Sequence, residues 1–551
     1  MKIIFIVKSN MLKSKPEQLI IYLAVIISLI FTPINFDALI IPKVAILFAT
    51  ALYIMPNLIT HTNGFFPDPK LALLLVISST IIFQMIIVML LSEAPFEQEF
   101  FGRTGRGLGF ATYFSVVILI LCMAIFSKLN DSNFIILWLS ISGLVSSLYA
   151  LTQRFGFDIF NWESRTNGII GTLGNPNFQS SFTAMTLIPI LVYSFSKSIK
   201  YVAIPIISLI FVSTLYFTQS TQGYIVLSAA VLIFLLLFTW YGKRRFFFPL
   251  LSSGVLVGAF AIAGMLNKGP LAYYLYKPSV QSRGDFWRSA FNAANANPVF
   301  GTGIDSFGDS FLIYRDRQKI EMTDNAHNYF LEFAATGGYT LAILNLLIIF
   351  LTLFSFISLQ NKLGKFDANL SSIFCAWIVF QMQSLISPGT ITLIVWGAIL
   401  SGFLIGSNVR YVIDQDSIKK IENKPKFLTQ TASVCLLMIG LLIMFPLYKT
   451  DRDLKKGLAL KNGDMVMSAL TAYPQSSVKY NIFTQEFLKS NLLPQAVDLG
   501  RKAVKFNPNS VSAWALIFVN PQAPLEERIN ARDEILRLDP LNTEVFTFKL
   551  E

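Results

Sequence analysis

The sequence has 551 residues, of which 54% are hydrophobic, only 14% are charged, and 50 are phenylalanine. Its mean hydropathy is +0.58, and its apolar fraction exceeds the roughly 45–50% of soluble globular proteins, so an ordinary soluble enzyme is excluded. The net charge of +12 does not indicate a nucleic-acid-binding protein, because most Lys and Arg residues flank apolar runs, as they do in membrane proteins.

Apolar segments of about 18–22 residues recur along the chain, and each is long enough to cross the ~30 Å hydrocarbon core of a bilayer. Lipid offers no hydrogen-bond partners to the backbone, and the runs are continuous rather than alternating, so they predict helices. We therefore expect an all-α fold, a polytopic bundle of about 12–13 transmembrane helices within a membrane domain at residues 1–447. The predicted spans are 18–36, 38–56, 71–92, 107–127, 134–151, 179–196, 201–218, 223–240, 246–266, 329–358, 370–387, 391–407 and 427–447.

The distribution of Lys and Arg predicts the orientation of these spans. With the N-terminus in the cytoplasm, every second connection is rich in basic residues, including 243–245 and 410–426, as the positive-inside rule requires. The same alternation places the loops at about 93–106, 152–178 and 267–328 on the outer face, together with the tail after residue 447.

Two short outer-face segments carry polar patterns. In the first, Arg103 and Arg106 lie among glycines at 102–109, and they either contact a substrate or extend to the interface at a helix start. In the second, Arg165 precedes a run at 171–177 in which Gly and Asn-Pro mark tight turns. We predict that Asn177 caps the following helix, and a ligand contact is the alternative.

The third segment, at 267–328, is about sixty residues long, which is too long for a simple connector. It contains Arg283, Trp287, Arg288 and His327, one of only two histidines in the chain. Arginine holds phosphate through a planar fork of donors, and a histidine pKa near ~6.5 suits proton transfer. The pattern favours chemistry on an anionic, lipid-anchored substrate; the alternative is a solvated loop with a structural histidine. We expect residues 289–295 to form a short surface helix.

The tail at 448–551 changes character, because charges return and apolar runs end. Pro474, Pro508 and Pro540 are spaced by 34 and 32 residues, close to the 34-residue period of tetratricopeptide repeats. We predict a TPR-like helical-repeat domain on the outer face, with an unrelated small helical domain as the alternative. Such repeats usually bind partners.

Several motifs are missing from the sequence. It has no phosphate-binding Gly-x-x-x-x-Gly-Lys loop, no Gly-x-Ser-x-Gly elbow and no His-Glu-x-x-His pair, so no cofactor and no metal site is expected. Few acidic residues lie in the middle of spans, which argues against an ion-coupled carrier.

An ordered set of motifs in the third segment resembles the O-antigen ligase and O-antigen polymerase superfamily of membrane glycosyltransferases, which includes the WaaL, Wzy and PglL types. The resemblance covers roughly residues 100–345, with the runs at 102–109 and 171–177 among its features. The motifs are Arg283-x-x-x-Trp287, Asn297-Pro298-x-x-Gly301-x-Gly303, His327-Asn328-x-Phe330-Leu331 and Gly338.

The resemblance implies a bacterial inner-membrane enzyme that transfers a glycan from a polyprenyl-diphosphate donor to a glycan, lipid or protein acceptor on the periplasmic face. Arg283 would stabilise the charge that develops on the diphosphate, and His327 would act as the base, oriented by Asp324 or Glu332. Trp287 and Asn328 would contact the substrate.

Two positions depart from the family pattern: Leu341 stands where a second glycine is usual, and Gln222 where an arginine is usual. Arg165, Arg103 and Arg288 are the candidates to supply the missing cation.

The resemblance leaves open an O-antigen ligase acting in lipopolysaccharide biosynthesis, a polysaccharide polymerase, or a protein O-oligosaccharyltransferase. A solute transporter or a scaffolding subunit of a cell-envelope complex would also explain the spans and the tail. Membrane lipids and a protein bound through the repeats are further expected partners.

Overall fold

The structure is a computed structural model that describes residues 15–61, 68–158, 160, 162, 167–196, 203–318, 321–412 and 427–546; Arg165 lies outside them. The described chain is built from helices, without strands. Its membrane-type helices are α2 (Pro16–Leu29), α3 (Ile41–Thr60), α4 (Pro69–Leu91), α6 (Phe110–Phe126), α7 (Ser132–Arg154), α8 (Pro176–Ser196), α9 (Ala203–Phe217), α10 (Thr221–Gly242), α11 (Phe247–Met265), α15 (Tyr329–Leu363), α16 (Ala368–Ile386), α17 (Ile391–Val412) and α19 (Phe427–Ala459).

Each of the thirteen predicted spans has a counterpart among these helices. Ten of the helices in the described residues are long and apolar enough to cross a membrane, and α2, α6 and α9 are shorter apolar helices. The prediction of a polytopic helical membrane protein is therefore confirmed. The second helix, α3, begins with Pro42 in its first turn, a position that proline tolerates because the first N–H groups of a helix have no partner within it.

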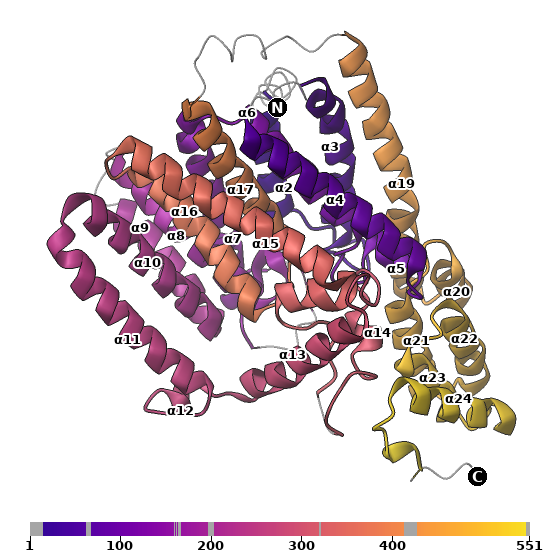
Figure 1. The fold of residues 1–551 in the computed structure, drawn as a ribbon. Helices are drawn as coiled ribbons and strands as arrows, with labels where there is room; N and C mark the ends of the chain where they lie inside the picture. Colours follow the sequence, from indigo (N-terminus) through magenta and orange to yellow (C-terminus); the bar gives the residue numbers. More distant parts are fainter. Residues whose placement is uncertain are drawn as a thin grey trace.

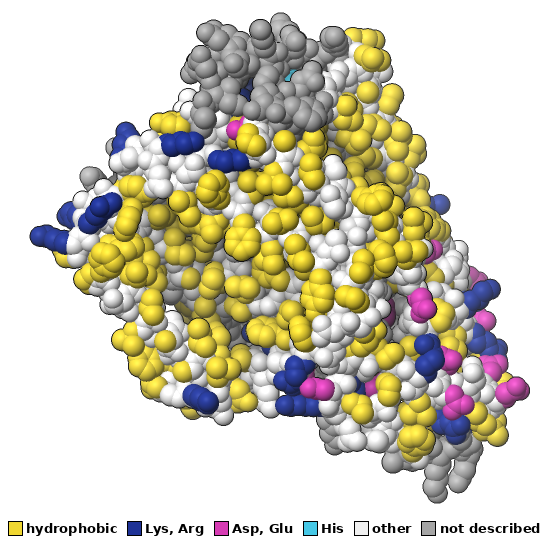
Figure 2. Space-filling view, in the orientation of Figure 1, with side chains coloured by type: hydrophobic (Ala, Val, Ile, Leu, Met, Phe, Trp, Pro, Cys, Tyr) yellow, Lys and Arg dark blue, Asp and Glu magenta, His cyan; other side chains and the backbone are white. Residues whose placement is uncertain are grey.

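The helices place the polar segments at one end of the bundle (Figure 1). The short helices α12 (Ala272–Leu275), α13 (Pro278–Ala296) and α14 (Phe307–Ser310) lie at the lower end of the view, as does the tail, whereas the α10–α11 and α15–α16 connections lie at the upper left. Figure 2 shows Lys and Arg side chains gathered along that upper left edge and mixed charges over the tail, with a broad hydrophobic band between them.

The core of the bundle surrounds α17, which is buried along its whole spanning length and packs against α6 and α15. Its tryptophan, Trp396, is fully buried and donates from Nε1 to Ser28 Oγ at 2.9 Å. The opposite extreme is α11, whose spanning stretch is not buried by the protein at all. A helix that is apolar on all sides and unburied in this way has a surface suited to lipid.

The polar segment is more helical than the sequence indicated. A short surface helix was expected at 289–295, but α13 begins at Pro278 and continues to Ala296. Pro278 occupies the first position of this helix, which its fixed φ suits. Arg283, Trp287 and Arg288 therefore lie on one rigid helix.

The capping residue before α8 also differs from the prediction. Asn175, not Asn177, accepts the backbone N–H of Asn177 at 2.8 Å. Asn177 instead accepts a hydrogen bond from Ser220 Oγ at 2.6 Å, which joins the start of α8 to the turn before α10. The helix begins two residues earlier than a cap at Asn177 would require, because Pro176 occupies its first position.

The tail follows α19 without a break: this helix continues to Ala459, past Pro446 and the predicted boundary at 447. It is followed by α20 (Gly463–Thr471), α21 (Ser477–Lys489), α22 (Leu493–Phe506), α23 (Val511–Phe518) and α24 (Leu525–Leu538), which pack mainly against their sequence neighbours. Tyr480, Phe483, Ala496 and Ala503 are buried in α21 and α22, whereas Phe487 of α21 is half-buried.

The tail contacts the membrane-domain loops through specific polar pairs. Arg315 of the polar segment forms a buried ion pair with Asp539 beyond α24, with Nη2 to Oδ1 at 2.7 Å. Thr104 and Ser476 hydroxyls lie 2.7 Å apart. These pairs join the tail to two loops that are distant from it in sequence, so the tail packs directly against the membrane domain.

Candidate functional site

The site is built around the entry of α15. Its regular geometry is interrupted at Gly338, whose φ of +76° is strained for residues with a Cβ atom. The Asn-Pro motif packs into this break: Tyr339 N donates to Pro298 O at 2.8 Å and Thr302 N to Ala335 O at 2.9 Å. A Cβ atom at Gly338 would lie 2.3 Å from Val299 O. The glycine thus permits backbone contacts that fix the start of α15 beside the polar segment.

Arg106 lies at the centre of a buried ionic network. Its Nε lies 3.1 Å from Asp305 Oδ1 and its Nη2 lies 3.2 Å from Glu332 Oε1. Its Nη1 donates to the Asp324 carbonyl at 3.0 Å. Burial would lower the pKa of Arg106, but Glu332, Asp305 and Asp324 outweigh it and hold the pKa above its ordinary value. The guanidinium is therefore permanently charged and held among carboxylates, with Nε in ion-pair contact with Asp305 rather than in a hydrogen bond among the described residues.

This network holds the turn that carries His327. Glu332 Oε2 accepts the backbone N–H of Ala326 at 2.6 Å, so that Glu332 connects Arg106 to the residue before His327. His327 N donates to Asn325 Oδ1 at 2.9 Å, and His327 itself has a φ of +50°. A left-handed backbone is uncommon outside glycine, and here the surrounding hydrogen bonds maintain it.

The His327 imidazole is presented to α13. Its ring stacks on Phe286 with centroids 5.5 Å apart and planes at 25°. Nδ1 is buried without a hydrogen-bond partner among the described residues. Burial and the nearby Arg283 lower the pKa of His327 to about 4, so that the ring is neutral at pH 7. Asp324 or Glu332 was expected to orient the imidazole, but Glu332 is occupied by Arg106 and the backbone of Ala326.

Arg283 lies three residues before Phe286 on α13, and therefore on the same helix face. Its Nε is buried and makes no hydrogen bond within the described chain, and no carboxylate there forms an ion pair with it. Burial lowers its pKa from the ordinary arginine value, which still leaves it charged at neutral pH. The structure thus places the two predicted catalytic residues near each other, and the Arg283 guanidinium has no counter-ion in the described part of the chain.

The two other described arginines in the predicted set are already paired. Arg103 Nη1 lies 2.9 Å from Asp309 Oδ1. Arg288 pairs with Asp285 in the preceding turn, and its Nε lies 2.8 Å from Asp316 Oδ2. Neither arginine is therefore free to replace the cation that the family has at the position of Gln222.

The structure gives the three uncharged candidates different surroundings. Asn328 is the N-cap of α15, and its Oδ1 accepts from the Phe330 and Leu331 N–H groups. Gln222 Nε2 donates to Ser181 Oγ at 3.0 Å, and its Oε1 is buried without a partner. Trp287 Nε1 is likewise buried and unpartnered in the described part of the chain.

The polar segment and its flanking helices match a known family. Residues 206–346 match the O-antigen ligase family. Over these residues the chain is similar to an O-antigen ligase domain. No curated protein and no solved structure matches the chain.

The O-antigen ligase domain contains α9 to α14, the start of α15 and both predicted catalytic residues. The predicted resemblance began earlier, near residue 100. The glycine-rich runs at 102–109 and 171–177 therefore lie outside the matched residues, although Arg106 of the first run pairs with Asp305, Asp324 and Glu332 inside the domain.

Sequence reasoning missed the role of Arg106 and Asp305. Asp305 accepts the backbone N–H groups of Arg103 at 2.7 Å and Leu108 at 3.2 Å, and burial raises its pKa despite the nearby arginines. About 200 residues separate these groups along the chain, so no local spacing could reveal the pairing. Among the described residues no group of three or more His, Cys, Asp and Glu is placed to hold a metal ion.

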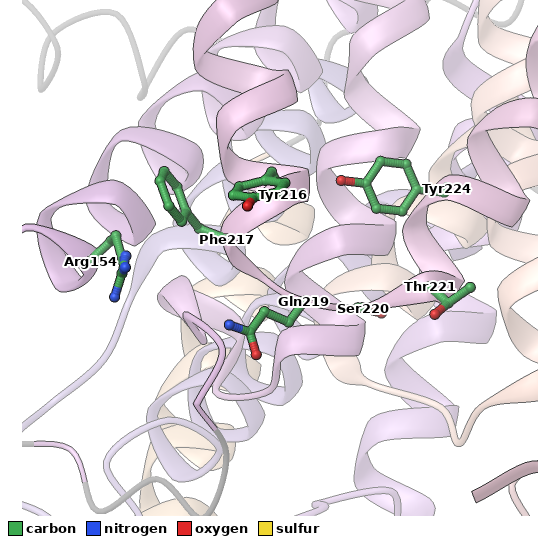
Figure 3. A pocket seen from close by; sticks show the side chains of 7 residues that line it. All are labelled: Arg154, Tyr216, Phe217, Gln219, Ser220, Thr221 and Tyr224. Carbon is green, nitrogen blue, oxygen red and sulfur yellow. The ribbon is translucent and has the colours of Figure 1, made fainter. Parts of the chain in front are cut away.

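A hollow of about 470 Å³ opens beside the O-antigen ligase domain's first two helices (Figure 3). It lies at the turn between α9 and α10, close to Gln222. A cation reaches this turn from α13: Lys277 Nζ donates to Thr221 Oγ1 at 3.1 Å. The sequence had suggested arginines for this place, and Lys277 was not among them.

Proposed function

We propose that the protein is a membrane glycosyltransferase that transfers a glycan from a polyprenyl-diphosphate donor to an acceptor hydroxyl or amine, most simply as an O-antigen ligase. The observation that carries the proposal is Arg283, a part-buried guanidinium that has no counter-ion among the described residues and lies beside a neutral imidazole within the matched residues. A buried charge without a partner is costly. Its presence is explained if an anionic substrate completes the pair.

The chemistry follows from these two groups. Breaking the anomeric C–O bond leaves the bonding electrons on the diphosphate, and a positioned guanidinium stabilises this charge through two parallel N–H donors. The attacking acceptor oxygen or nitrogen forms the new bond to the anomeric carbon and gives its proton to His327. The energy is already stored in the diphosphate bond, so no nucleotide is needed for this step.

Donor binding would also prepare the base. In the free protein, burial and Arg283 hold the pKa of His327 near 4, low for a base that acts at neutral pH. A bound diphosphate would neutralise Arg283 and add negative charge nearby, and both changes raise the pKa of the imidazole. The base would therefore become effective only when the donor is in place.

The first test is Arg283→Ala in purified protein with a fluorescent lipid-linked glycan donor. We expect transfer to fall by at least ~10²–10³-fold, the typical effect of removing one donor to a developing charge. Arg283→Lys should rescue poorly because an ammonium lacks the bidentate fork. Arg317→Ala is the matched control, since Arg317 is exposed on the same segment and pairs with Asp285 at 3.4 Å. Full activity of Arg283→Ala would refute the proposal.

We further propose that the catalytic segment and the tail face the periplasm from a bacterial inner membrane. The support is the separation of the basic connections from the polar segment along the bundle (Figure 2). Single cysteines near residues 290 and 480 should react with an impermeant thiol reagent in intact cells permeabilised only at the outer membrane, and one near 244 should not. The reverse pattern would exclude an outer-face reaction.

A further inference from the structure

The hollow between α9 and α10 has a distinctive lining. It is formed by the end of α7, the end of α9 and the first turn of α10, and Figure 3 shows the hydroxyl of Tyr224 directed toward Tyr216. The lining residues are Arg154, Tyr216, Phe217, Gln219, Ser220, Thr221 and Tyr224.

Three of the seven lining residues are aromatic, and the two tyrosines among them are exposed. Tyr216 is 68% exposed and Tyr224 is 42% exposed, while the Arg154 guanidinium lies 5.2 Å from the Phe217 ring centroid. No lining residue is acidic. The hollow therefore suits a neutral or anionic ligand with apolar faces rather than a metal ion or an amine.

The polar groups are placed around these rings. Gln219 has a φ of +55°, a conformation that is uncommon for residues other than glycine. Gln219 supplies an amide that can both donate and accept hydrogen bonds. Ser220 Oγ already donates to Asn177 Oδ1 and can still accept, whereas Thr221 Oγ1 accepts from Lys277 Nζ and can still donate. A sugar ring has C–H groups on its faces, which pack on aromatic rings, and hydroxyl groups around its edge, which need such partners. The combination matches a saccharide.

The hollow is also connected to the reaction site. Lys277, which donates to Thr221, is the N-cap of α13. Arg283 follows six residues later, about 9 Å along the helix axis at 1.5 Å per residue. A glycan whose diphosphate lies at Arg283 would therefore have its sugars within reach of the aromatic rings.

We propose that this hollow is a saccharide subsite that binds the glycan of the lipid-linked donor. The proposal rests on the proposed function for the identity of the donor, but its binding chemistry can be measured without any transfer. The subsite would select glycans by their sugar faces, while Arg283 would recognise the diphosphate that all such donors share.

The experiment uses the full-length protein in nanodiscs and the free oligosaccharide released by mild acid from the lipid-linked glycans of the source strain. Affinity is measured by titration calorimetry and contacts by saturation-transfer NMR. We expect Tyr216→Ala with Tyr224→Ala to weaken oligosaccharide binding by about tenfold or more, and Arg154→Ala to weaken it less. Tyr273→Ala with Tyr274→Ala is the matched control, because these tyrosines are 87% and 65% exposed outside the hollow.

The outcomes separate this proposal from the proposed function. Unchanged oligosaccharide affinity in the Tyr216 and Tyr224 variant would overturn the subsite, even if Arg283→Ala abolishes transfer. The subsite is equally overturned if that variant changes only the affinity for lipid, because the tyrosines would then be interfacial anchors. Conversely, loss of oligosaccharide binding in a protein whose Arg283→Ala variant still transfers glycan would support the subsite and refute the mechanism.

Discussion

Two arginines of the same protein, Arg106 and Arg283, lie in contrasting surroundings close to His327. Arg106 is surrounded by Asp305, Asp324 and Glu332, and each of its nitrogens contacts one of these residues. Arg283 is part-buried and has no counter-ion among the described residues. A buried cation that is fully paired maintains the architecture, whereas one without a partner is available to a ligand. We call Arg106 and its three acidic partners the frame of the site, and Arg283 with His327 its reactive face. The contrast between the two arginines separates these two parts.

The largest expected effect comes from the reactive face. His327→Gln keeps polarity and approximate size but removes the base, so the transfer rate should fall by ~10²–10⁴-fold. Donor affinity should be largely preserved, because Arg283 remains. Rate and donor binding are measured on the same purified protein. A near-normal rate would reduce His327 to a packing role against Phe286.

Substitution in the frame should lower the stability of the protein as well as its activity. Arg106→Met leaves three carboxylates near one another without their cation, and breaking a buried ion pair typically costs about 3–5 kcal/mol. We expect a marked loss of thermal stability in detergent, together with loss of activity. Arg283→Met should leave stability unchanged or raise it, because it removes an unpaired part-buried charge. Equal losses of stability in both variants would contradict the contrast between the two arginines.

The smallest effect is a shift in titration. Since the chain has only two histidines, His61→Gln leaves His327 as a single imidazole for NMR. Its pKa should be about 4 and should rise in Arg283→Met, because a repelling cation is removed. The base is neutral above its pKa, so kcat/KM should fall only as the pH drops through about 4, and kcat should begin to fall at a higher pH. An NMR titration centred near 6.5 would disprove the burial of the ring.

The sequence predicted the fold well because each span is a local property: about twenty apolar residues in a row require no knowledge of the neighbours. It also singled out Arg283 and His327, through the motifs that surround them; the structure places the two residues near each other, and their catalytic roles stay a prediction. It did not show that Arg103 and Arg288 are already engaged, because Asp309 and Asp316 approach them only in the folded structure. The capping role of Asn328 was equally hidden, since a helix cap and a ligand contact use the same side-chain atoms.

The ion pair between Arg315 and Asp539 has a consequence for biogenesis. These residues are 224 positions apart, and one belongs to the polar segment while the other follows α24. A nascent chain is delivered to the membrane from its N-terminus, so the polar segment emerges long before Asp539. The segment must wait for the last helices before it gains this contact, and a chain interrupted before Asp539 would carry an unsecured polar segment. The contact between the polar segment and the tail therefore requires the chain through Asp539.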